Sequence, residues 1–187
     1  MAERLAGFGL VVGVGDLGVG KQPDAQIVTY ALGSCIGVCA FDPVTRVGGM
    51  LHFMLPQPAE GSSDGIERPA LYASTGLPLL FRRLQEAGAL RERCIVCAAG
   101  GAEIVGAAGA FAIGKRNRTI LRKLCWKDGT ALAAEDVGDD FARTLVLSLV
   151  DGAVKVRSHG AERVLWQPGM PTRPAPTATR MPTLEGT

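Results

Sequence analysis

Short apolar stretches rich in β-branched residues recur along the first 160 residues, separated by turns that contain glycine or proline. This pattern is typical of β-strands. One or two strands are expected within residues 7–20, and single strands at residues 27–32, 93–99, 130–134, 144–150 and 153–157. Asp151 and Gly152 predict a two-residue hairpin turn between the last two of these strands.

A further hairpin is predicted around the turn sequence at residues 42–45. A four-residue loop there pairs Phe41 with Arg46, and the same register puts Cys35 directly opposite His52. Directly opposed residues point to one face of the sheet, with their Cβ atoms about 5 Å apart. The strand pattern therefore predicts a contact between a thiol and an imidazole.

Apolar residues follow a helical spacing in two other segments. The first runs from Pro69 to Ala87 and stops at Gly88, and Pro78 is expected to kink it or split it. The second begins near Asn117, a favourable N-cap residue. The side chains expected to face the core are Leu77, Leu80, Phe81 and Leu84 in the first helix and Ile120, Leu121, Leu124 and Cys125 in the second. These elements predict an α+β (layered α/β) fold, with mostly antiparallel sheets and two helices packed on one side.

The composition is that of a globular protein, since 47% of the 187 residues are hydrophobic. The net charge of +2 is close to balance, which argues against nucleic-acid binding. No apolar run reaches the roughly 18 residues that a membrane span needs, and the N-terminus lacks the pattern of a secretory signal. We expect residues 1–166 to form one domain, followed by a disordered tail at residues 167–187 that contains five prolines.

The five cysteines indicate reduced thiols and a cytoplasmic location, because their number is odd and their spacing forms no disulfide framework. Cys94 and Cys97 form a C-x-x-C motif, but within a strand they point to opposite faces. No second motif of this kind completes a zinc site. Core packing is therefore favoured for both, as for Cys39, and no metal or cofactor is expected.

Two glycine motifs near the N-terminus resemble nucleotide-binding sequences. Residues 13–18 fit G-x-G-x-x-G, and residues 15–21 fit the first part of a phosphate-binding loop. Such loops need a helix directly behind them, and Pro23 and Asp24 leave no room for one. Gln22 also stands where a magnesium-binding hydroxyl is required. Nucleotide binding is therefore disfavoured.

Cys35 and His52 are the leading candidates for catalysis. Gly33 and Ser34 allow a tight corner before Cys35, in which successive N–H groups can face one point and form an oxyanion hole. A histidine in register with a cysteine on such a corner predicts a thiol nucleophile and its base. Thr29 is the candidate group for orienting the imidazole. A purely structural role for Thr29, as a β-branched residue of a strand, explains its presence equally well. The second histidine, His159, lies in a polar segment and is expected to be solvated.

These residues resemble the motifs of one family, the chemoreceptor glutamine deamidases CheD. The resemblance spans about residues 10–158, in the order and spacing of the family. It rests on residues 29–35, 41–43, 48–52, 54–56, 100–102, 113–117, 134–138 and 143–144. The run before the glycine pair at residues 100–101 departs from the family pattern, and the tail has no counterpart in it.

The resemblance implies a deamidase fold and a protein-glutamine amidohydrolase of bacterial chemotaxis. It places the nucleophile on Cys35, the base on His52 and the histidine-orienting residue on Thr29. The implied substrates are glutamines on the cytoplasmic helices of chemoreceptors, and the implied partner is the phosphatase CheC. Two alternatives stay open at this point: a regulatory module that docks on CheC or receptors with little catalysis, and a thiol hydrolase of another amide.

Overall fold

The computed structural model describes residues 3–5, 9–23, 25–103 and 112–172. Their strands form two sheets. The first has the order β1 (Glu3–Leu5), β2 (Gly9–Val11), β4 (Gln26–Leu32), β9 (Arg143–Ser148), β10 (Val154–Ser158) and β11 (Ala161–Trp166). The second has the order β3 (Asp16–Gly20), β6 (Val47–Phe53), β5 (Ile36–Asp42), β7 (Ile95–Gly100) and β8 (Leu132–Val137). Only the pairs β2–β4 and β7–β8 are parallel, so the sheets are mostly antiparallel, as predicted.

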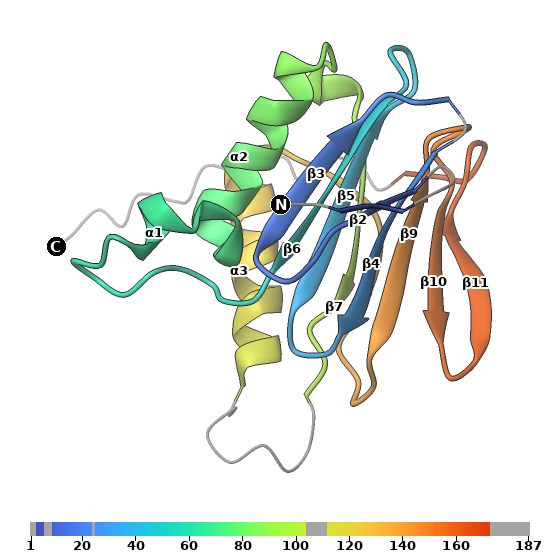
Figure 1. Cartoon of the computed structure of the whole chain (residues 1–187). Helices are drawn as coiled ribbons and strands as arrows, with labels where there is room; N and C mark the ends of the chain where they lie inside the picture. The colour runs from blue at the N-terminus through green and yellow to red at the C-terminus, as the bar shows by residue number, and fades with distance from the viewer. Residues whose placement is uncertain (1–2, 6–8, 24, 104–111, 173–187) are drawn as a thin grey trace, which may run out of the picture.

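The helical segments are α1 (Asp64–Glu67), the 3₁₀ turn η1 (Pro69–Leu71), α2 (Ala73–Glu86), the 3₁₀ turn η2 (Arg91–Arg93) and α3 (Ile113–Lys127). Figure 1 shows α2 and α3 on one face of the five-stranded sheet and the six-stranded sheet on its other face. The molecule thus has three layers, and the α+β prediction with helices on one side is confirmed.

The central sheet separates two apolar cores. Alternate residues of β5 and β6, such as Val38 and Leu51, pack against α2 and α3, whereas Cys39 and Met50 pack against the six-stranded sheet. Every residue of these two strands is buried because both faces of the sheet are covered. His52 has the same parity as Met50, so its side chain enters the layer between the sheets.

The predicted hairpin register is wrong by two residues. Phe41 pairs with Gly48, and His52 pairs with Gly37, not with Cys35. The turn still has four residues, but it begins at Pro43, because Asp42 remains in the strand opposite Val47. A shift of two residues preserves the face of each strand residue. Cys35 itself lies just outside the ladder, which begins with the pair of Ile36 and Phe53.

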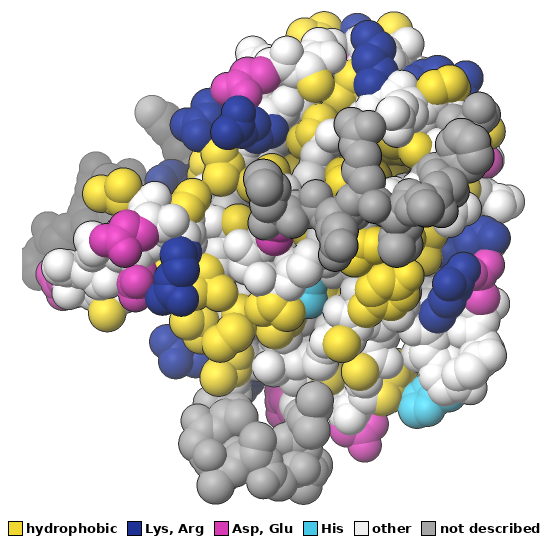
Figure 2. All heavy atoms as spheres, viewed as in Figure 1, with side chains coloured by type: hydrophobic (Ala, Val, Ile, Leu, Met, Phe, Trp, Pro, Cys, Tyr) yellow, Lys and Arg dark blue, Asp and Glu magenta, His cyan; other side chains and the backbone are white. Residues whose placement is uncertain are grey.

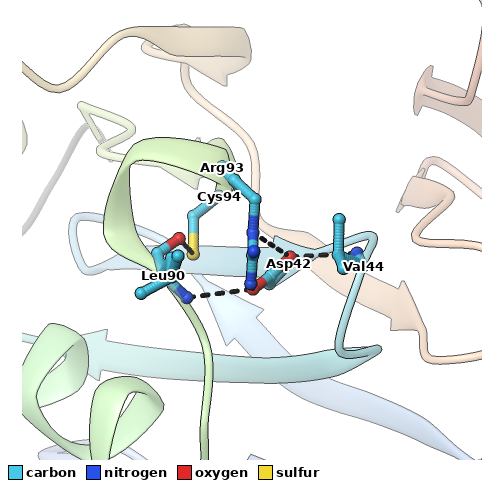
Figure 3. Close-up of polar contacts among 5 residues, drawn as sticks. All are labelled: Asp42, Val44, Leu90, Arg93 and Cys94. Atoms are coloured by element: carbon cyan, nitrogen blue, oxygen red, sulfur yellow. Dashed lines mark hydrogen bonds and ion pairs between the residues drawn. The ribbon is translucent and has the colours of Figure 1, made fainter.

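The Asp42 carboxylate anchors this end of the hairpin (Figure 3). It accepts hydrogen bonds from the N–H groups of Val44 and Leu90, each at 2.9 Å, and from the Arg93 guanidinium, with Nη2 2.5 Å from Oδ2. Burial by itself would raise the pKa of this carboxyl, but the hydrogen bonds outweigh burial and hold the pKa well below its usual range. The cluster joins β5 to η2, where the Cys94 thiol donates to the carbonyl of Leu90 at 3.4 Å.

The first predicted helix is interrupted at Tyr72, not at Pro78. The N–H of Ala73 donates to Leu55 O, and the N–H groups of Met54 and Leu55 donate to Leu71 O. These bonds to the end of β6 hold Tyr72 extended, with φ −116° and ψ 139°. Pro78 lies inside the continuous α2, which ends before Gly88 as predicted. Its four predicted core residues, Leu77, Leu80, Phe81 and Leu84, are buried.

Three other predictions need correction. The second helix begins at Ile113, four residues before Asn117, so Asn117 is not its N-cap. The turn between β9 and β10 spans residues 149–152, with Gly152 N donating to Ser148 O, and is not a two-residue turn. Strand β11 was not predicted. The tail prediction falls largely on residues 173–187, which lie outside the described residues.

Candidate active site

His52 lies near the end of β6, between Asp16 on β3 and Gly37 on β5. Its side chain is buried and faces β4 of the other sheet. There the Thr29 Oγ1 lies 2.7 Å from His52 Nδ1 and also 2.7 Å from the carbonyl oxygen of Val12. A predicted third residue is thus brought to the imidazole by the packing of two sheets.

This hydrogen-bond chain fixes the tautomer of the imidazole. A threonine hydroxyl has one hydrogen, and a carbonyl oxygen can only accept. The hydroxyl therefore donates to Val12 O and accepts from the Nδ1–H of His52. The lone pair then resides on His52 Nε2, which is buried and has no hydrogen-bond partner among the described residues. The ring presents an available base.

Gly37 makes room for this contact between the sheets. It pairs directly with His52, and a Cβ at this position would lie 3.0 Å from Leu32 Cδ1 and 3.1 Å from Thr29 Cγ2. Distances this short require the neighbours to move. A glycine opposite the histidine therefore lets the threonine of the second sheet approach the ring.

Cys35 lies on the connection between β4 and β5, where the chain passes from one sheet to the other. The pairing of β4 with β9 shifts register between Thr29 and Leu32, and Ala31 has a φ of +56°. Gly33 N then donates to Ala31 O at 2.9 Å, and residues 33–35 form a bend. This bend ends directly at Ile36, whose partner Phe53 is the neighbour of His52. The chain therefore bends at the predicted glycine corner, and the bend leads into the end of β5 that pairs with the residue after His52.

Three successive carbonyl groups of the corner accept hydrogen bonds from one side. Gly33 O accepts from Ala102 N at 2.8 Å, Ser34 O from Asn117 Nδ2 at 2.9 Å, and Cys35 O from Gly101 N at 2.7 Å. In a trans peptide the N–H points away from the preceding C=O. The N–H groups of Ser34 and Cys35 are therefore directed to the opposite side of the corner.

Burial favours the neutral forms of the His52 and Cys35 side chains. It lowers the pKa of His52 to about 4. It also raises the pKa of the Cys35 thiol, although a hydrogen bond from the backbone of Cys35 acts in the other direction. At neutral pH the resting pair is a thiol and an imidazole, not a thiolate and an imidazolium.

The remaining candidates lie elsewhere. His159 is exposed in the turn after β10, with its ring centroid 4.4 Å from that of Phe141. Cys97 is buried opposite Cys39 in the pairing of β7 with β5, in agreement with core packing, and Cys94 precedes that strand. Among the described residues, no group of three or more His, Cys, Asp or Glu side chains is arranged to hold a metal ion.

Sequence reasoning missed Asn117 as a neighbour of the corner. Its amide also donates to Met54 O at 2.8 Å, and its side chain is buried. The signal was available, because Asn117 precedes the inward position Leu121 by four residues and so shares the inner face of the helix.

Exposed apolar side chains adjoin the site in sequence. Tyr30 follows Thr29, Met54 follows Phe53, and Val14 precedes Gly15, whose N–H donates to His52 O at 2.8 Å. Figure 2 shows hydrophobic side chains exposed on the face that carries β2 and β3. Within the described residues, no helix has both the length and the apolar character needed to cross a membrane.

Comparison with known proteins identifies the family. Residues 54–158 match the family model described as CheD chemotactic sensory transduction, a match that begins two residues after His52. A probable chemoreceptor glutamine deamidase CheD of Solibacter usitatus is 43% identical over 156 residues, which cover 83% of this chain and 92% of the relative. The probable chemoreceptor glutamine deamidase CheD 2 of Anaeromyxobacter dehalogenans is 46% identical, with coverages of 80% and 94%. The probable chemoreceptor glutamine deamidase CheD of Pyrococcus horikoshii is 39% identical over 82% of this chain and 94% of the relative. The chain therefore belongs to the CheD family.

Proposed function

We propose that this protein is a chemoreceptor glutamine deamidase in which Cys35 is the nucleophile, His52 the base and Thr29 the residue that orients the base. The observation that carries the proposal is the hydrogen bond between Thr29 and His52, which leaves Nε2 without a partner among the described residues. The names of the relatives support the reaction, since they are named as probable chemoreceptor glutamine deamidases.

The reaction begins from the neutral pair. His52 Nε2 takes the proton of the thiol while Sγ attacks the carboxamide carbon of a glutamine side chain. The resulting imidazolium returns this proton to the nitrogen of the tetrahedral intermediate. The C–N bond then breaks, ammonia leaves and a thioester between Cys35 and the substrate remains.

Water completes the cycle. His52 Nε2 accepts a proton from water while the oxygen attacks the thioester carbon, and the thiol leaves as glutamate forms. The overall change is the hydrolysis of one carboxamide to a carboxylate and ammonia. The low pKa of His52 suits the acid step, because an imidazolium in this buried position gives up its proton readily.

The corner supplies the site for the negative charge. The N–H groups of Ser34 and Cys35 point away from the three occupied carbonyls, and they are the donors we assign to the oxyanion. Gly33 makes the bend possible. Hydrogen bonds to the carbonyl groups of residues 33–35 fix this backbone, so the two N–H donors need little reorganisation when the negative charge develops.

The proposal is tested by incubating the protein with the cytoplasmic fragment of a chemoreceptor and following shifts of +1 Da at glutamine residues by mass spectrometry. Cys35→Ser and His52→Ala are expected to abolish these shifts. Retention of the wild-type pattern in Cys35→Ser would refute the assignment of the nucleophile.

A regulatory role is the second candidate function. The exposed apolar side chains of Val14, Tyr30 and Met54 offer a surface on which a protein can dock. CheC is the partner to examine, and a pull-down with Cys35→Ala separates docking from catalysis, since docking does not require the thiol. We also propose a cytoplasmic location, because the substrate glutamines lie on the cytoplasmic helices of the receptors.

A further inference from the structure

Asn117 is a fully buried polar residue of α3 that connects two parts of the site. Its Nδ2 donates one hydrogen bond to Ser34 O at 2.9 Å and a second to Met54 O at 2.8 Å. Ser34 directly precedes Cys35, and Met54 lies two residues after His52. One side-chain amide therefore holds both the nucleophile segment and the base segment.

We propose that Asn117 is a positioning residue that sets the geometry between Cys35 and His52. The proposal rests on the function proposed above. The peptide that joins Ser34 to Cys35 carries the carbonyl that Asn117 holds, so fixing this carbonyl also fixes the direction of the Cys35 N–H. The same bond thereby positions the thiol and an oxyanion donor.

The pairing of β5 with β6 cannot by itself fix the position of Cys35 relative to His52. It ends at Ile36 opposite Phe53, so Cys35 and Met54 both lie just beyond the last pair. The ladder between the two strands stops at that pair, and Asn117 bridges the two chains just beyond it. Asn117 thus joins the two chains at the end of the hairpin where strand pairing stops.

Packing alone does not account for an asparagine here. Asn117 is 0% exposed, and its Oδ1 has no hydrogen-bond partner among the described residues. A buried polar atom without a partner is destabilising, so an apolar residue would suit the interior of α3 better. The side-chain amide donates both of its hydrogens to carbonyl groups of the site, and this role explains why the residue is an asparagine.

The start of α3 is fitted closely to the corner. A Cβ on Gly114 would lie 2.3 Å from Ala102 O and 2.6 Å from Gly101 O, so only a glycine allows this approach. Gly101 and Ala102 are the residues whose N–H groups hold Cys35 O and Gly33 O. Asn117, three residues after Gly114, is thereby placed one helical turn deeper, against Ser34.

The test compares Asn117→Ala with the wild-type protein in two assays. In receptor deamidation, kcat is expected to fall about 100-fold with little change in KM, because a displacement of about 1 Å of a reacting group has an effect of this size. In alkylation by iodoacetamide, followed by mass spectrometry of peptides, Cys35 is expected to react faster because its corner loosens. Cys94, which is half-buried and outside the site, is the internal reference and should react at the wild-type rate.

Leu121→Ala is the matched control. Leu121 is buried one turn further along the same helix, in the apolar core between the helices and the central sheet, and its side chain has no group that could hold the carbonyls of Ser34 and Met54. This variant should lower Tm but keep kcat per folded molecule and the Cys35 alkylation rate. Asn117→Ser, whose single hydroxyl cannot hold both carbonyls, replaces Asn117→Ala if that variant does not fold.

The outcomes separate the two proposals. Wild-type kcat and Cys35 alkylation in the folded Asn117 variants would overturn the positioning role, as would equal changes in Leu121→Ala. If the wild-type protein deamidates no receptor fragment, the proposed function fails, whereas the alkylation assay still decides whether Asn117 holds Cys35 in place.

Discussion

The protonation state of His52 determines whether the site can act through general base catalysis. Its ring is buried between two sheets, and Thr29 accepts the hydrogen of Nδ1. Burial lowers the pKa of the ring to about 4, so Nε2 carries a lone pair throughout the neutral range. In the proposed reaction, the Cys35 thiol is then activated during the attack, not in the resting protein.

This protonation state predicts the pH dependence of the reaction. The acid limb of kcat/KM is expected near pH 4, well below the value of about 6.5 for an ordinary histidine. Initial rates of deamidation between pH 3.5 and 8, corrected for any unfolded protein, measure it. A limb near pH 6.5 would contradict the neutral thiol–imidazole pair.

The same residue predicts a pH dependence of stability. Between pH 4 and 6.5 the unfolded chain binds a proton at this histidine and the folded chain does not, so the free energy of unfolding rises with pH across this window. The change contributed by His52 is about 3 kcal/mol. Urea unfolding at several pH values should show this slope in the wild-type protein, and the slope should be smaller in His52→Gln.

Thr29 is expected to act through its hydroxyl and not through its bulk. Thr29→Val retains the shape but leaves the Nδ1–H of His52 and the carbonyl of Val12 without their partner, which costs about 1–3 kcal/mol. Activity should fall about 10- to 100-fold, because the tautomer and the ring orientation are no longer fixed. Thr29→Ser keeps the hydroxyl and should retain most of the rate. Equal rates in Thr29→Val and the wild-type protein would exclude an orienting role.

At the scale of elements, the connection from β4 to β5 carries the site. It takes the chain from one sheet to the other, so the residues on either side of the bend face each other across the layer between the sheets. The end of β7 and the residues after it support the bend, with Gly100 at a φ of +112° and Gly101 at +64°. The corner is held by backbone groups whose positions depend on these two glycines.

Gly100→Ala is expected to disturb the corner. A Cβ there would lie 2.3 Å from Cys35 O, and its positive φ is unfavourable for alanine by about 1–2 kcal/mol. We expect lower stability and at least a tenfold loss of kcat. Gly129→Ala is the matched control, because Gly129 also has a positive φ but has no atom within 4 Å of the added Cβ. Its Tm should fall while its rate remains that of the wild-type protein.

At the scale of the whole molecule, three layers bury His52, the proposed base, while Cys35, the proposed nucleophile, stays partly exposed. The helices cover one face of the central sheet and the six-stranded sheet covers the other (Figure 1). His52 lies in the second interface, and Cys35 lies on a connection at the end of that interface. A glutamine side chain can therefore reach the thiol from outside, while Thr29 and the imidazole remain shielded from water.

The boundary after residue 166 is expected to mark the end of the catalytic unit. Trp166 is the last residue of β11 and is buried, whereas the described residues after it are exposed. Removal of residues 167–187 should leave Tm and the deamidation rate unchanged, because it deletes none of the described core. A fall in Tm of several degrees in a thermal melt would show that the tail contributes to the fold.

Local patterns in the sequence predicted many of the elements and the face of the hairpin that carries the site. The error of two residues in the register leaves the face of each strand residue unchanged, because the period of a strand is two, but it places Cys35 outside the ladder. The exact turn depended on Asp42, whose carboxylate is held by Leu90 and Arg93, partners that lie 48 and 51 residues away. No local pattern contains that information.

The sequence alone determined the residue types of the candidate site, the glycine corner and the hairpin that carries His52, because these depend on neighbours in the chain. Only the tertiary structure decided the tautomer of His52, its low pKa and the two bonds of Asn117. Thr29 and His52 are 23 residues apart and belong to different sheets, and Asn117 is 83 residues from Ser34. Contacts of this kind arise when layers pack, and the burial that shifts the pKa exists only in the packed molecule.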